Sequence, residues 1–267
     1  MNFTETVLET LEKLPGLKDL RAMVADYYER RLFRKVKARG NLPRHVAIIT
    51  NGKGTSKQGE GIPTPEGGKL DKVLEWCREL GIKHATVFAL PIGLLKRSDK
   101  EVKNHMRLFK RRFKEITKDE KIHDNKIRVR GIGEIDSLPK EIKSTVNRAE
   151  EATKGYDRYF LNIAVGYGGR QELAKAIMRI SELVKKGELE PEDISENTID
   201  NHLYTAGQPD PDLIIRTSER ETLSGFLLWQ SAYSELYFCE ANWPAFDKKD
   251  FLRAISTYQR RERRFGE

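Results

Sequence analysis

Five short apolar runs rich in β-branched residues alternate with amphipathic helical patterns along the chain. The runs cover residues 45–50, 82–90, 126–133, 159–169 and 212–218. Residues 226–240 carry a helix-like apolar face and leave room for a short further strand. Strands that alternate with helices usually form a parallel sheet, because each helix carries the chain back across it. The sequence therefore predicts an α/β fold with a mostly parallel central sheet flanked by helices.

The helical patterns lie between these runs. They cover residues 2–38 with a break at Pro15–Gly16, 65–81 ending at Gly81, 98–118 capped by Ser98, 138–154, 170–187 and 248–266. Residues 185–212 read as a helical connection that a proline turn closes. Since the sequence shows no internal repeat and no linker, we expect N-terminal helices over 1–40 and one structural unit over 41–267.

Composition excludes several classes of protein. The two cysteines, Cys77 and Cys239, lack metal-ligand spacing, which excludes a disulfide scaffold and a zinc site. No apolar run approaches the roughly 18 residues that cross a bilayer, and we expect a cytoplasmic protein without a signal peptide. The net charge of +8 suits phosphorylated ligands, nucleic acid or anionic lipid, or only a solvated surface. No nucleic-acid motif supports the second of these, so we expect no nucleic-acid partner.

The basic stretch between residues 30 and 37 allows two interpretations. It contains five cations, Arg30, Arg31, Arg34, Lys35 and Lys37. Such a stretch can rest on an anionic membrane as a peripheral contact. A solvated helix face is the interpretation that we favour.

Candidate chemistry lies where ligands gather in parallel α/β sheets, at the carboxyl ends of the strands. The turn "TNGKGTSKQGEG" follows the first run, but it fits neither GxGxxG nor a P-loop, and glycine there can serve the backbone alone. The loop "RTSERETLSG" brings Arg216, Ser218 and Ser224, whose donors suit a phosphate. Its plainer interpretation is a surface loop that pairs with its own glutamates.

Several of these segments together resemble the cis-prenyltransferase family, which includes undecaprenyl diphosphate synthase. The matching motifs are "HVAII", "WCRELGIKHATVFAL", "GYGGRQEL", "DLIIRTS", "FLLWQSAYSELYF", "WPAF" and "YQRRERRFG", in family order over residues 41–266. The resemblance implies a dimeric α/β fold with a hydrophobic tunnel. It also implies Mg²⁺-dependent condensation of isopentenyl diphosphate onto an allylic diphosphate.

The family pattern is broken at the site that the resemblance assigns to the allylic diphosphate. Asn51 stands where the family has its metal-binding aspartate, and an amide oxygen is a poor Mg²⁺ ligand. Other polar family residues are replaced by Lys53, Thr55, Thr64, Gly68, Pro91, Gly166 and, near the asparagine position, Gly93. Because positioned charges supply most of the catalysis in such chemistry, we predict that this chain has no intact catalytic residue.

The second site and the C-terminal tail keep more of the family pattern. Arg216 and Ser224 match residues that hold isopentenyl diphosphate, Thr222 replaces a second arginine, and Ser218 and Arg170 join the substrate-binding candidates. Glu235 matches a family acid and is our metal-ligand candidate. In the family the tail completes the neighbouring subunit's site, a role that falls here on Arg264 and Gly266.

These features favour an accessory subunit similar to the Nogo-B receptor type, in a heterodimer or heterotetramer with an intact cis-prenyltransferase subunit that holds the Mg²⁺. Two alternatives stay open. One is a self-sufficient, divergent homodimeric synthase, for which Glu60, Glu66 or Glu235 could supply a relocated carboxylate. The other is a non-catalytic binder of prenyl diphosphates.

Overall fold

The structure, a computed structural model, describes residues 18–50, 68–96, 99–218 and 221–261. It divides into two compact units. The first comprises residues 1–42 and 246–267, and the second comprises residues 43–245. The division after Leu42 lies close to the predicted boundary after residue 40. The assignment of residues 41–267 to one structural unit stays a prediction.

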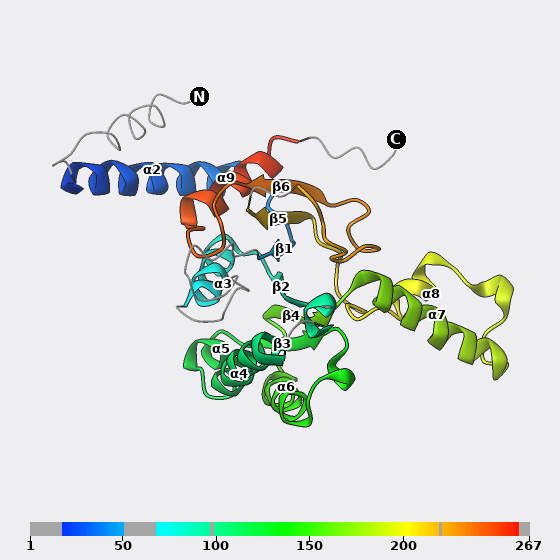
Figure 1. Cartoon of the computed structure of the whole chain (residues 1–267). Coiled ribbons are helices and arrows are strands. Elements are labelled where there is room, and N and C mark those ends of the chain that lie inside the picture. The colour runs from blue at the N-terminus through cyan, green and yellow to red at the C-terminus, as the bar shows by residue number, and fades with distance from the viewer. Residues whose placement is uncertain (1–17, 51–67, 97–98, 219–220, 262–267) are drawn as a thin grey trace. The chain divides into compact units, whose positions relative to one another are not determined.

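A six-stranded sheet forms the centre of the larger unit, and all of its neighbouring strands are parallel (Figure 1). The predicted fold class is therefore confirmed. The strand order is β3-β4-β2-β1-β5-β6. The strands are β1 His45–Ile49, β2 His84–Pro91, β3 Ile127–Ile132, β4 Tyr159–Tyr167, β5 Leu213–Thr217 and β6 Glu235–Cys239. Every residue of β1 and β5 is buried, which explains why both read as unbroken apolar runs.

The helices of this unit occupy the predicted connections. They are α3 Lys69–Leu80, α4 Asp99–Ile116, α5 Glu120–Asp124, α6 Lys140–Thr153, α7 Gly169–Lys185 and α8 Glu196–Asp200, with short 3₁₀ turns η1 Ile92–Lys96, η2 Ile135–Ser137 and η3 Pro191–Asp193. Gly81 ends α3 with φ 77°, as predicted. The sequence did not predict α5. The predicted cap Ser98 lies outside the described residues.

The segment 226–240 does not form the helix that its apolar face predicted. Residues 224–233 form turns, and only the short strand β6 follows. Positive φ values at Ser224 (53°) and Leu227 (45°) are incompatible with a right-handed helix. The apolar side chains of this segment instead pack on the sheet, as described below.

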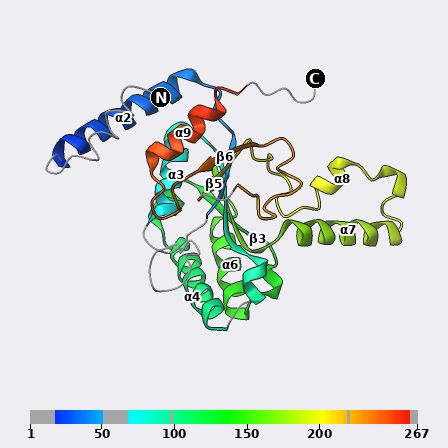
Figure 2. The same cartoon turned by 45° about the horizontal axis from the view of Figure 1, so that its top comes forward.

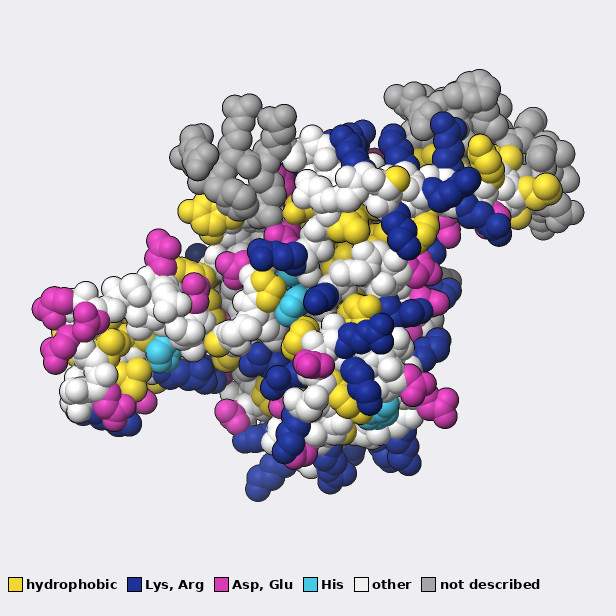
Figure 3. Space-filling model, turned by 180° about the vertical axis from the view of Figure 1, so that it is seen from behind, with side chains coloured by type: hydrophobic (Ala, Val, Ile, Leu, Met, Phe, Trp, Pro, Cys, Tyr) yellow, Lys and Arg dark blue, Asp and Glu magenta, His cyan; other side chains and the backbone are white. Residues whose placement is uncertain are grey.

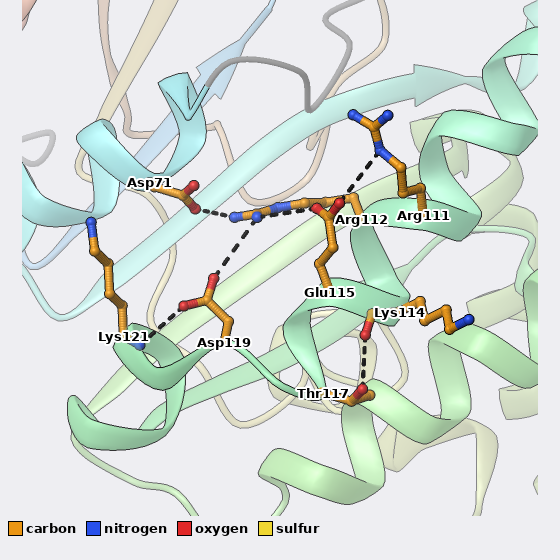
Figure 4. A network of polar contacts seen from close by, with 8 residues as sticks. All are labelled: Asp71, Arg111, Arg112, Lys114, Glu115, Thr117, Asp119 and Lys121. Carbon is orange, nitrogen blue, oxygen red and sulfur yellow. Dashed lines mark hydrogen bonds and ion pairs between the residues drawn. The ribbon is translucent and has the colours of Figure 1, made fainter.

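Helix α3 is fixed to α4 by a buried arginine (Figure 4). The Arg112 side chain is 9% exposed and pairs with Asp71 of α3, with Glu115 at 3.7 Å and with Asp119 at 3.8 Å. A buried guanidinium group requires such partners, because desolvating an unpaired charge is costly. This contact therefore fixes the first turn of α3, which contains Asp71, against α4.

The helices α7 and α8 extend away from the sheet in two views (Figures 1 and 2). Acidic side chains gather at the outer end of this projection, whereas Lys and Arg side chains cover much of the surface around α4, α5 and α6 (Figure 3). The excess positive charge is therefore spread over helices, and charge alone does not mark a site.

The smaller unit pairs α2 (Lys18–Arg39) with α9 (Lys248–Tyr258). Gln259 Nε2 donates to Val36 O at 2.9 Å, and Lys248 lies over the ring of Phe33 at 5.1 Å. The helix predicted over 248–266 ends at Tyr258, and residues 262–266 lie outside the described residues. No helix in the described part of the chain is long and apolar enough to cross a membrane.

Candidate functional site

Arg216 is the centre of the candidate site. It lies at the carboxyl-terminal end of β5, is only 2% exposed, and donates from Nη1 to Ser224 Oγ at 3.0 Å. The Thr222 hydroxyl lies 3.3 Å from the same Ser224 oxygen. The structure therefore brings together two of the predicted substrate-binding residues, with the fixed fork of donors that suits a diphosphate.

Threonine hydroxyl groups join the strand ends next to this pair. Thr217 Oγ1 donates to Ile49 O at 3.2 Å, which links β5 to β1. Thr50 Oγ1 donates to Phe88 O at 2.6 Å, which links the end of β1 to β2. These contacts fix the carboxyl-terminal ends of β1 and β5. The backbone at Thr50 and Arg216 is therefore held in place.

The 222–228 loop covers the sheet face on which Arg216 lies. Phe226 is buried and stacks on Phe88 with ring centroids 4.7 Å apart, and Tyr167 meets both rings edge-on at 5.8 Å. Buried aromatic pairs of this kind stabilise by about 1 kcal/mol beyond the area that they bury. This aromatic trio therefore anchors the loop that carries Ser224.

The backbone of the 222–228 loop is held in an unusual conformation. Ser224, Gly225 and Leu227 have φ values of 53°, 75° and 45°. Left-handed residues other than glycine cost about 1 kcal/mol or more, so neighbouring contacts must maintain them. Gly169 N donates to Gly225 O at 2.9 Å, and Leu227 N donates to the Tyr167 hydroxyl at 3.2 Å.

A buried glutamate supports these contacts. Glu172 is 2% exposed and accepts from the Tyr167 hydroxyl, from Tyr204 N at 2.8 Å and from Gln230 Nε2 at 3.1 Å. Burial raises the pKa of Glu172 above its ordinary value, and these donors oppose that shift. Burial also raises the pKa of Tyr167, so its phenol stays protonated and can donate.

The first residue of α7 allows no side chain, and this gives a prediction. A Cβ atom at Gly169 would lie 2.6 Å from Gly225 O and 2.7 Å from Leu228 Cγ. We expect Gly169→Ala to displace the 222–228 loop and, with the isopentenyl diphosphate that the family resemblance implies as substrate, to raise the KM several-fold. Steady-state kinetics measure this effect. Gly155→Ala is the control, because a Cβ atom there meets nothing within 4 Å. Equal KM values for both variants would contradict the prediction.

The other predicted residues lie farther from the pair or outside the described chain. Ser218 follows β5, with its amide donating to Cys239 O at 2.9 Å. Arg170 is exposed in the first turn of α7, and no hydrogen bond or ion pair among the described residues joins it to Arg216. Glu235 pairs with Leu213 at the amino-terminal end of β6, roughly 10 Å along the strand from the Arg216 level. Asn51, Arg264 and Gly266 lie outside the described residues.

A metal site is not found among the described residues. They contain no group of three His, Cys, Asp or Glu side chains that could hold a metal ion. The described end of β2 and the turn after it present Pro91 and Gly93, which carry no polar side chain. Gly166 has φ 59°, a left-handed conformation that asparagine also adopts readily.

Comparison with known proteins identifies the family. The undecaprenyl diphosphate synthase family model matches residues 64–266. This chain belongs to the undecaprenyl diphosphate synthase family. The tritrans,polycis-undecaprenyl-diphosphate synthase (geranylgeranyl-diphosphate specific) of Methanocaldococcus jannaschii is 50% identical over 233 residues, covering 85% of this chain and 83% of that protein. An isoprenyl transferase of Deinococcus radiodurans is 43% identical over 248 residues, covering 90% of each.

A comparison with solved structures agrees with this family assignment. Lavandulyl diphosphate synthase from Lavandula x intermedia, in complex with dimethylallyl diphosphate, matches with a TM-score of 0.77 and 32% identity. The match covers 85% of this chain and 99% of that chain. The family resemblance and the prenyltransferase class are therefore confirmed. The comparisons do not support the accessory character, because these relatives are named as a synthase and an isoprenyl transferase.

Two side chains that contact the loop of the candidate site or support those contacts were missed from the sequence, Tyr167 and Glu172. Both lie inside "GYGGRQEL", five positions apart, in a segment that marked the family without assigning their roles. The available signal was a tyrosine at the end of an apolar run and an acid in the first turn of the next helix. That spacing gives no hint of the distant loop they support.

Proposed function

We propose that this chain takes part in the synthesis of a polyprenyl diphosphate, the precursor of a glycosyl carrier lipid. In this reaction isopentenyl diphosphate forms a carbon–carbon bond with an allylic diphosphate, while pyrophosphate and a proton leave. The observation that carries the proposal is Arg216, buried at the end of β5 and held by Ser224 at 3.0 Å. This pair binds the diphosphate of isopentenyl diphosphate through charge-assisted hydrogen bonds.

The first arrangement is a homodimer that is a complete synthase. It is supported by the relatives, which are named as synthases, several of them geranylgeranyl-diphosphate specific. By analogy, geranylgeranyl diphosphate is the allylic substrate. In this arrangement carboxylates outside the described residues, such as Glu60 or Glu66, replace the aspartate lost at Asn51.

The second arrangement is an accessory subunit of a heteromeric synthase. It is supported by Asn51 and by the loss of the other polar residues of the allylic site. The intact partner subunit then binds the Mg²⁺ and the allylic diphosphate, and Arg264 and Gly266 complete the partner's site. No step is assigned to Mg²⁺ on this chain, because the described residues contain no group that fits it.

Exposed apolar side chains in the larger unit support assembly in either arrangement. Ile177 and Met178 of α7 are 61% and 62% exposed, and Tyr233 before β6 is 70% exposed. Large apolar side chains at such exposure are typical of surfaces that another subunit covers.

The basic stretch of α2, with Arg30 paired to Asp26 at 2.9 Å, is the candidate for peripheral membrane contact.

An incorporation assay decides between the arrangements. Radiolabelled isopentenyl diphosphate is supplied with geranylgeranyl or farnesyl diphosphate and Mg²⁺, to this chain alone and to its mixture with an intact family member from the same cell. Activity alone supports the homodimer. Activity only in the mixture, above that of the intact member alone, supports the accessory subunit. Binding without turnover in both would leave a non-catalytic binder.

Changing Asn51→Asp in the chain alone gives a prediction. If the chain is an accessory subunit, the single aspartate should create no measurable turnover, because an isolated carboxylate lacks the diphosphate donors around it. The same radiolabel assay measures this, with the unchanged chain as the control. Strong turnover by the variant would show that the allylic site is otherwise intact.

A further inference from the structure

The Tyr167 hydroxyl joins two parts of the molecule that are distant in sequence. It donates to Glu172 at the start of α7 and accepts from the Leu227 amide at 3.2 Å. We propose that Tyr167 is a positioning residue, whose hydroxyl group holds the 222–228 loop in the conformation that places Ser224 against Arg216. The inference rests on the proposed role of that pair in binding isopentenyl diphosphate.

Glu172 fixes the direction of the Tyr167 hydroxyl. A phenol has one proton to donate, and donating it to a carboxylate turns the oxygen lone pairs toward other donors. The Leu227 amide is the donor that meets them. Tyr204 N and Gln230 Nε2 hold Glu172 in turn, and Gln230 Nε2 also lies 2.9 Å from Thr205 Oγ1. Buried polar groups linked in this way restrain one another.

The loop needs this contact because of its backbone conformation. Ser224 and Leu227 have positive φ values without being glycine, so each would relax if its neighbours released it. The loop also has the ring contacts of Phe226, which fix its apolar side, and the hydrogen bond from Gly169 N to Gly225 O at 2.9 Å. The hydrogen bond to Leu227 fixes the backbone three residues from Ser224, and that backbone directs the serine hydroxyl toward Arg216.

The test compares two single-hydroxyl deletions in the full chain, assayed without a partner subunit because the Arg216–Ser224 pair belongs to this chain. Tyr167→Phe removes the hydroxyl and keeps the ring against Phe88. Tyr156→Phe is the matched control, because its hydroxyl lies 2.9 Å from His123 Nδ1 and, among the described residues, takes part in no hydrogen bond of the 222–228 loop. We expect Tyr167→Phe to raise the KM for isopentenyl diphosphate about tenfold with kcat changed less than about threefold. The control should stay within about twofold of the unchanged chain in both parameters.

Hydrogen exchange at the Leu227 amide gives a readout that does not depend on turnover. We expect it to become about tenfold faster in Tyr167→Phe and to be unchanged in Tyr156→Phe. Unchanged KM and unchanged exchange in Tyr167→Phe would overturn the inference. If the unchanged chain neither binds nor incorporates isopentenyl diphosphate in any arrangement, the proposed function fails, and the exchange measurement still decides whether Tyr167 holds the loop.

A second variant keeps the inference testable if Tyr167→Phe does not fold. Glu172→Met fills the volume of the glutamate and removes the acceptor that orients the Tyr167 hydroxyl. It should also speed exchange at Leu227. Exchange as slow as in the unchanged chain would count against the proposed role, and circular dichroism confirms that each variant is folded.

Discussion

In the proposed homodimeric arrangement, replacing Arg216 by methionine is expected to lower isopentenyl diphosphate incorporation about a thousandfold. The reason is that Arg216 provides the buried cation at the end of β5, and donors aimed at a diphosphate contribute factors of about 10² to 10³ or more. Methionine retains most of the buried volume, so the loss reports charge and hydrogen bonds more than a cavity. The measurement is kcat/KM from radiolabel incorporation, with circular dichroism to confirm folding.

Two further variants locate the effect within the Arg216–Ser224 pair. Arg216→Lys keeps the charge but loses the planar fork, and we expect a smaller loss of about 10- to 100-fold. Ser224→Ala removes the hydroxyl that accepts from Arg216 at 3.0 Å, and we expect a loss of about tenfold. Equal losses for all three variants would indicate misfolding of the loop, not loss of individual substrate contacts.

The same variants distinguish the two arrangements. In a homodimer, Arg216→Met removes activity because this chain carries the working site. In an accessory subunit the working site belongs to the partner, so Arg216→Met should spare the mixture while Arg264→Ala abolishes its turnover. Which of the two variants lowers turnover therefore shows whether the working site lies in this chain or in the partner.

Much of the fold could be predicted from the sequence because most strands appear in it as short apolar runs. Runs such as "HVAII" and "DLIIRT" are buried on both faces. Such burial is typical of inner strands of a parallel sheet that helices cover on both sides. The short strand expected within 226–240 is β6, but the helix expected there was wrong for a related reason. Phe226 and Leu227 are buried by long-range contacts with Phe88 and Tyr167, and local periodicity cannot distinguish such contacts from a helical apolar face.

The candidate site could be predicted only in part. Arg216 and Ser224 lie eight residues apart in a motif that suits a phosphate, and the structure brings them together. The support from Tyr167 and Glu172 depends on which residue of β4 lies beside a distant loop, which spacing does not encode. The register of β6 likewise sets Glu235 beside Leu213, at the opposite strand end from Arg216. Its role as a metal ligand stays a prediction.

A second large effect is expected on the free energy of unfolding, from protonation of a buried histidine at the amino-terminal end of β1. His45 is fully buried, with Nδ1 2.7 Å from Pro209 O and Nε2 2.8 Å from Thr86 Oγ1. Because a carbonyl group only accepts, Nδ1 carries the proton and Nε2 accepts from the Thr86 hydroxyl. That hydroxyl in turn accepts from Asn162 Nδ2 at 2.9 Å. Each group in this chain of hydrogen bonds has its partner only while the imidazole is neutral.

Burial lowers the pKa of His45 to about 4, and the nearby His84 contributes to the same shift. In the unfolded chain a histidine has a pKa of about 6.5, so the unfolded state binds the proton more readily. Stability is therefore full above pH 6.5 and falls as the pH drops toward 4. A difference of about 2.5 pKa units corresponds to a loss of about 3 kcal/mol in the free energy of unfolding.

Urea unfolding at pH 7.5 and pH 4.5, followed by tryptophan fluorescence, measures this loss. Carboxylates also titrate in this range, so the decisive quantity is the difference between the unchanged chain and His45→Gln. Glutamine can donate and accept in the same pocket but cannot take up the proton, so we expect its pH-dependent loss to be about 2 to 3 kcal/mol smaller. His84→Gln should remove a smaller part, because His84 is only half buried. The same pH dependence in His45→Gln and the unchanged chain would show that His45 is not the group whose protonation destabilises the sheet.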